Sequence, residues 1–159
     1  MIELINILKY RLLWLNFILV LLTAALSFFY ADFAALLFVL LSNLFDILGY
    51  HFALIRRTNQ LPEKVIIRSY RVNQFMFDLL LLILIAIQFS WIAALSGFIM
   101  KWFGLQDILY YLFLQKELPE LWTWMKWTPF GAIKGNLNRF EIIIQAITGM
   151  IIAILILLN

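Results

Sequence analysis

The stretch LSNLFDILGYHFALIRRTNQ, residues 41–60, decides how the rest of the sequence is interpreted. Most of it is apolar enough to lie in lipid, yet it contains the acid Asp46 and the only histidine, His51. It continues into two consecutive arginines, Arg56 and Arg57. Charged side chains are rare inside membrane helices, where they face the protein interior or a water-filled cavity. The stretch therefore predicts a membrane helix with a polar inner face.

The composition of the whole chain supports a membrane protein. Of the 159 residues, 65% are hydrophobic and 13% are charged, whereas soluble domains average about 45–50% and about 25%. A soluble domain of this size has too small an interior to bury so much apolar surface. We therefore predict an all-α fold: a single domain over residues 1–159 that forms a polytopic bundle of transmembrane helices.

Two classes of function are excluded or disfavoured by residue usage. The chain has no cysteine, which excludes disulfides, thiol redox chemistry and thiolate metal sites. Its net charge of +3 comes from basic residues gathered between apolar segments rather than spread over a soluble face. That distribution is typical of membrane topology signals and predicts no nucleic-acid partner.

The apolar segments predict four membrane spans and one further helix. A tight link joins the first two segments and makes them an antiparallel hairpin. The segment that begins near Lys101 also contains Asp107, and its uninterrupted apolar part is too short to cross, so we expect an interfacial or re-entrant helix there. The predicted spans cover about residues 12–29, 33–55, 74–98 and 141–158, and the further helix covers about residues 102–115.

The charge distribution predicts the orientation. It favours a different number of spans from the one that segment length favours. Five basic residues crowd the connection over residues 56–71, which marks that connection and the N-terminus as cytoplasmic. Four spans place seven Lys and Arg residues inside and five outside, whereas five spans place eleven inside and one outside. Segment length and Asp107 favour four spans, and charge favours the five-span alternative. Either arrangement suits a multi-pass protein of a plasma membrane or bacterial inner membrane.

Polar residues on the second and third predicted spans indicate a pocket that opens toward the cytoplasm. On the second span they lie within about 60° of one another at 100° per residue, and on the third span Gln74 and Asp78 lie together. Both groups approach the same basic connection. The predicted ligand-binding residues are Asn43, Asp46, Tyr50, Arg57, Arg68, Arg71, Gln74 and Asp78.

Several roles are open to these groups. Arginines hold anionic groups such as phosphate, and Asp46, Asp78 and His51 are the candidates for acid or base catalysis. Alternatively, the two acids pair with arginines or polar neighbours and only fix the helix register. We predict no metal site, because Asp46 and His51 are five residues apart and cannot share a metal on one helix face.

A second candidate site comprises Asp107, Tyr110 and Tyr111. Their spacing places both phenols within reach of the carboxylate on one helix. With four spans this group lies near the opposite membrane face from Asp46, so we expect two separate sites.

Three functions agree with these patterns. The first is binding or transport of a lipid head group or small amphipathic molecule, with membrane lipids as partners. The second is a lipid-modifying enzyme that uses Asp46 or Asp78. The third is a noncatalytic subunit of a larger complex, because Gly149 and Ala153 form a small-residue face on which another membrane subunit or a second copy can pack. The sequence identifies no cofactor.

Overall fold

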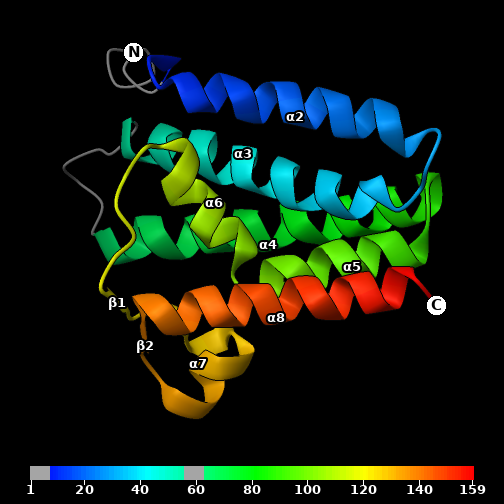
Figure 1. Ribbon diagram of the computed structural model, residues 1–159. Coiled ribbons are helices and arrows are strands. Elements are labelled where there is room, and N and C mark those ends of the chain that lie inside the picture. Colours follow the sequence, from blue (N-terminus) through cyan, green and yellow to red (C-terminus); the bar gives the residue numbers. More distant parts are fainter. Residues whose placement is uncertain (1–7, 56–62) are drawn as a thin grey trace.

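The computed structural model describes residues 8–55 and 63–159, and within these ranges the chain is mostly helical (Figure 1). Seven α-helices, a short 3-10 helix and a two-stranded sheet form there. The predicted all-α class is confirmed. In chain order the elements are α2 (Arg11–Ser27), α3 (Phe33–Ile55), α4 (Glu63–Gln88), α5 (Trp91–Trp102), α6 (Leu105–Phe113), β1 (Leu121–Trp122), η1 (Met125–Trp127), α7 (Pro129–Lys134), β2 (Leu137–Asn138) and α8 (Arg139–Leu157).

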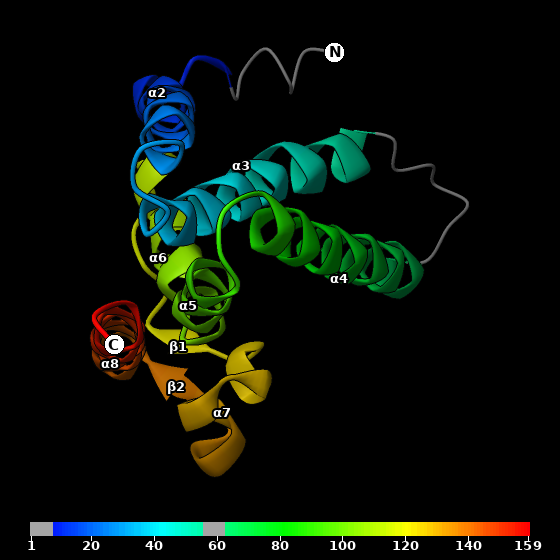
Figure 2. The ribbon, with the colours of Figure 1, turned by 90° about the vertical axis from the view of Figure 1, so that its right-hand side faces the viewer.

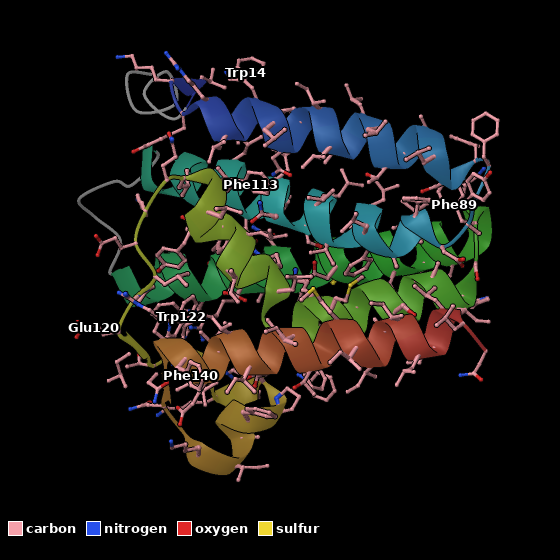
Figure 3. All side chains as sticks on the ribbon, in the orientation of Figure 1. Trp14, Phe89, Phe113, Glu120, Trp122 and Phe140 are labelled. Atoms are coloured by element: carbon pink, nitrogen blue, oxygen red, sulfur yellow. The ribbon has the colours of Figure 1, made fainter. Side chains whose placement is uncertain are left out.

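The long helices run side by side, which gives the bundle two ends (Figure 1). The Glu120 end and the Phe89 end are named after residues labelled in Figure 3. The Glu120 end holds the start of α2, the last turn of α3, the start of α4 and residues 114–138. The Phe89 end holds the α2–α3 link, the α4–α5 turn and the C-terminus. The two ends of α8 therefore lie at opposite ends of the bundle.

A turn interrupts the region that was predicted as one continuous helix over residues 74–98. Helix α4 ends at Gln88, and α5 begins at Trp91. The Ser90 hydroxyl caps α5 by accepting hydrogen bonds from the backbone N–H groups of Ile92 and Ala93, at 3.1 and 3.4 Å. A serine cap of this kind is a usual start for a helix. The turn between α4 and α5 reverses the direction of the chain at the Phe89 end.

Helices α5 and α6 form a pair that bends by 69° at Phe103 and Gly104. Gly104 has a φ of +88°, a left-handed conformation that side chains other than glycine rarely adopt. A Cβ there would also lie 2.7 Å from Cδ1 of Ile142. The pair starts at the Phe89 end, and α6 leads on toward the Glu120 end, where it packs on α3 and α2 (Figure 1).

The small-residue face of α8 is buried inside the chain. A Cβ on Gly149 would lie 2.3 Å from Cβ of Phe103, so only glycine allows this approach of α8 to the bend. Ala153 is fully buried, and its carbonyl accepts a hydrogen bond from the Ser96 hydroxyl at 3.5 Å. Within the chain, α5 and the bend pack on the Gly149/Ala153 face, and a partner at this face stays a prediction.

The outer surface is apolar along most of its length. On α2, α4 and α8 the exposed side chains include Leu21, Ile87 and Ile151, which are 70%, 75% and 53% exposed. Many exposed apolar side chains of this kind are typical of a surface that contacts lipid or protein.

Two helices of the described chain are long and apolar enough to cross a membrane, Arg68–Gln88 and Arg139–Leu157. The bent pair makes a third if it counts as one span, and α2 and residues 33–49 of α3 form shorter apolar helices. The fold is compatible with a membrane location, but the predicted four-span bundle is not confirmed.

The tryptophan-rich segment after α6, residues 114–138, forms a small lobe. Strands β1 and β2 pair antiparallel, with Leu121 opposite Asn138 and Trp122 opposite Leu137. Trp122 is fully buried in this lobe, whereas Trp127 is 79% exposed. The lobe lies at the Glu120 end beside the start of α8 (Figure 3).

Candidate functional site

Asp46 on α3 is the centre of a hydrogen-bond cluster that joins three helices. Its side chain is buried, with an exposure of 7%. Oδ1 accepts a hydrogen bond from Tyr70 Oη at 2.7 Å, and Oδ2 accepts bonds from Gln74 Nε2 at 2.7 Å and Gln106 Nε2 at 2.5 Å. Tyr70 and Gln74 are one turn apart on α4, and Gln106 lies in the first turn of α6. The bend at Gly104 thus places Gln106 against Asp46.

Asp78 lies on the same helix as Tyr70 and Gln74 but has a different partner. Its Oδ1 is 2.5 Å from Nζ of Lys101, the basic residue in the last turn of α5. The Ser42 hydroxyl donates a further hydrogen bond to the same oxygen at 3.2 Å. The side chains of Lys101 and Asp78 are only 11% and 15% exposed. A largely buried ion pair therefore fastens α5 to α4 and α3.

Two adjoining cavities lie beside these clusters. The inner pocket, of about 390 Å³, lies between α4 and α6 with Asp46 in its wall. The side pocket, of about 460 Å³, extends from there along α4 and α5 toward the lobe. The inner pocket is lined by Asp46, Tyr70, Arg71, Gln74, Gln106, Asp107, Tyr110, Tyr111 and Trp124. The residues that line both pockets are Arg71, Gln74, Gln106, Asp107 and Trp124, so the two cavities adjoin each other.

The side pocket ends in an aromatic rim. Phe75 of α4, Trp102 of α5 and Trp127 of the lobe line it, and they are 65%, 48% and 79% exposed. The Trp102 indole N–H donates to the carbonyl of Trp127 at 2.7 Å, which ties α5 to the lobe. Figure 2 shows α4 and the lobe that contains α7 on different sides of α5. The cavity thus changes from polar inside to apolar where it meets the surface.

The structure brings only some of the predicted binding residues to the pockets. Arg71, Gln74 and Asp78 line them together with Asp46. Arg68 is exposed and lines neither pocket.

Asn43 is fully buried outside both pockets, and its side-chain amide has no hydrogen bond with the described residues. The side chains of Tyr50 and His51 and the whole of Arg57 lie outside the described residues.

The second candidate site is part of the first one. Asp107, Tyr110 and Tyr111 line the inner pocket with Asp46, so the prediction of two sites near opposite faces is wrong. The turn between α4 and α5 explains the difference, because α5 runs back from the Phe89 end and carries α6 to α3 instead of leaving it at the far end. The spacing that placed these three residues on one helix face does hold within α6.

Several residues that line the pockets were not predicted from the sequence. Tyr70, Gln106, Lys101 and Trp124 belong to the pockets, although none was among the predicted binding residues. The sequence does indicate a role for Lys101, because a lysine amid apolar residues requires a partner inside the protein. In the described ranges no group of three or more His, Cys, Asp or Glu side chains is placed to hold a metal ion.

Comparison of the chain with protein-family models, with curated proteins and with solved structures gives no match. Function must therefore be inferred from the fold and the pockets alone. Together they define a class: a mostly helical chain with an apolar outer surface, in which a bent helix pair shapes a polar cavity with an aromatic rim.

Proposed function

We propose that the chain is a multi-pass membrane protein that binds a lipid head group, or a similar small amphipathic molecule, in the inner and side pockets. One observation carries the proposal: the two adjoining pockets extend from buried polar groups at Asp46 to exposed aromatic groups at Phe75, Trp102 and Trp127. An amphipathic ligand matches that gradient, since its polar part satisfies the interior and its apolar part covers the rim.

The bent pair supports a binding or transport role. Broken helices form the substrate sites of many transporters, because the break frees backbone groups and lets side chains converge. Here the break at Phe103 and Gly104 lies next to Gln106, which contacts Asp46. The Gln145 amide on α8 donates to the Phe103 carbonyl at 3.1 Å and so occupies one backbone group at the break.

We further propose five membrane crossings, made by α2, α3, α4, the bent pair as one broken span, and α8. The arrangement in Figure 1 supports this number, because residues 114–138 lie at the same end as the last turn of α3 and the start of α4. Eleven of the twelve Lys and Arg residues then lie on the cytoplasmic side. The pockets open at that side, near the head-group layer.

Labelling of single cysteines tests the number of crossings, because the native chain has no cysteine. Thr123→Cys and Asn159→Cys are exposed separately to an impermeant thiol reagent outside intact cells. Five crossings predict labelling at position 159 only, and four crossings predict labelling at position 123 only.

The two other functions remain predictions with less support. A lipid-modifying enzyme that uses Asp46 or Asp78 as its base has less support, because Asp78 is paired with Lys101 and Asp46 already accepts three hydrogen bonds. A noncatalytic subunit needs a contact surface, and the small-residue face of α8 is already covered by α5.

The binding proposal is tested by thermal unfolding of the detergent-solubilised protein with short-chain phospholipids. We expect these lipids to raise the Tm of the native chain, because a ligand that binds only the folded state stabilises it. Asp46→Asn should abolish most of that increase. Asp32→Asn is the matched control, because Asp32 is exposed in the α2–α3 link and should leave the increase unchanged. Absence of any lipid-dependent increase in the native chain contradicts the proposal.

A further inference from the structure

The charges along the pockets are incompletely paired. Lys101 and Asp78 neutralise each other. Arg71 lines both pockets and makes no hydrogen bond or ion pair with any described residue. Asp107 also lines both pockets, and no ion pair joins it to a described lysine or arginine. Asp107 accepts a hydrogen bond from the Trp124 side chain. Two groups of opposite charge that form no ion pair with a described residue therefore line the same pockets.

The inner pocket has an excess of acidic groups. Apart from the Lys101–Asp78 pair, the described pocket residues contribute two carboxylates, Asp46 and Asp107, and one guanidinium, Arg71. Asp46 accepts three hydrogen bonds from neutral donors, and a carboxylate has about four acceptor positions. Charged groups at membrane depth need compensation, so the inner pocket favours an occupant with a positively charged, hydrogen-bond-donating group.

Aromatic rings surround the same position. Tyr110, Tyr111 and Trp124 line the inner pocket together with Asp107. The Tyr110 and Tyr111 ring centroids are 5.5 Å apart, so the two side chains form one aromatic wall. The faces of such rings attract ammonium groups in addition to any carboxylate contact. Acids and aromatic rings thus select the same chemistry.

Resting on the proposed function, we infer that the ligand is a zwitterionic head group in which a phosphate precedes an ammonium. The order of groups along the cavity matches such a molecule. The aromatic rim receives the apolar chains, and Arg71, where the two pockets adjoin, binds the phosphate. Asp46, which lines the inner pocket alone, binds the ammonium together with Asp107, which lines both pockets. Arginine suits phosphate because its planar fork makes two parallel hydrogen bonds.

Equilibrium titration of the full-length solubilised protein with short-chain lipids tests the inference. Phosphatidylethanolamine and phosphatidylglycerol with identical chains share the phosphate but differ in the ammonium. We expect the ethanolamine lipid to bind with a Kd about tenfold lower, and N-acetylation of its amine to remove that advantage. Both comparisons use the native chain and do not depend on the folding of any variant.

Two variants separate the roles of the charges. Asp107→Asn should bring the Kd values of the two lipids together, with Glu117→Gln as the control that removes one exposed acid outside the pockets. Arg71→Gln should weaken binding of both lipids by about tenfold or more. Its control is Arg68→Gln, an exposed arginine one turn away that lines neither pocket.

The outcomes distinguish this inference from the proposed function. Equal affinity for the ethanolamine and glycerol lipids overturns the zwitterion and leaves lipid binding intact. Absence of binding by either lipid overturns both. Free phosphoethanolamine should bind at least about tenfold more weakly than the lipid, since it cannot cover the aromatic rim. If free phosphoethanolamine binds with the same affinity as the lipid, the ligand is still a zwitterion, but it is not a lipid.

Discussion

Asp46 and Asp78 are acids on neighbouring helices that line adjoining pockets, but the protein satisfies them in different ways. Asp78 lies 2.5 Å from the Lys101 ammonium. Asp46 is held by three neutral donors, and no described cation lies within ion-pair distance of it. A buried ion pair mainly fixes the packing of the elements that carry it. A carboxylate held by neutral groups keeps its capacity for a positively charged ligand, so we assign a structural role to Asp78 and a binding role to Asp46.

Lys101→Met should cause the largest loss of stability among the single substitutions considered. It leaves the Asp78 carboxylate largely buried with only the Ser42 hydroxyl as a described partner. We expect the free energy of unfolding in detergent to fall by about 3–5 kcal/mol, the usual effect of removing one partner from a buried ion pair. Denaturant titration of solubilised protein measures it.

The control for this prediction removes both charges. Lys101→Met with Asp78→Leu should recover most of the lost stability, because no uncompensated charge remains. A loss below about 1 kcal/mol in the single variant would mean that the pair behaves like a solvent-exposed one, and the structural role of Asp78 would have to be abandoned.

Gln106→Leu should have an intermediate effect. It removes the 2.5 Å hydrogen bond that links α6 to Asp46. Hydrogen bonds to charged groups contribute about 1.5–3 kcal/mol, and we expect a decrease of that size in the free energy of unfolding together with weaker lipid binding. The same titration with Gln88→Leu serves as the control, since Gln88 is exposed at the Phe89 end of α4. Equal stability of the two variants argues against the role of Gln106.

Ser42→Ala should have the smallest effect. Its hydroxyl makes one 3.2 Å hydrogen bond to an Asp78 oxygen that Lys101 also contacts. We expect a decrease of about 0.5–1.5 kcal/mol in the free energy of unfolding and no change in lipid-dependent Tm. The control is Ser69→Ala, at an exposed position on α4. A smaller lipid-dependent increase in Tm for Ser42→Ala than for the native chain would contradict the purely structural role assigned to Asp78.

Local features of this structure could be predicted from the sequence. The helical class follows from composition, and the polar faces of α3 and α4 follow from helical periodicity, which puts Asp46 and Gln74 on the inner sides of their helices. The tight α2–α3 link also follows, since few residues separate the two apolar segments. These features depend on residues close together in the chain.

The bend and the long-range pairs could not be predicted in the same way. The apolar run from Leu79 to Phe98 hides the turn at Phe89, because apolar residues continue through it and only Ser90 marks the helix start. The contact between Asp46 and Gln106 joins residues 60 positions apart, and no periodic pattern encodes it. The sequence shows Lys101 as a charge among apolar residues and Gly104 as a helix breaker. The residues that these two contact depend on how α5 and α6 fold back.

Native mass spectrometry of the protein purified in mild detergent shows directly whether a lipid occupies the pocket at Asp46. We expect the native chain to retain a bound phospholipid and Asp46→Asn to lose it. The Asp32→Asn control, at an exposed position in the α2–α3 link, should retain the lipid. A native chain with no bound phospholipid, or equal occupancy in the native and Asp46→Asn chains, would contradict a lipid-binding pocket at Asp46.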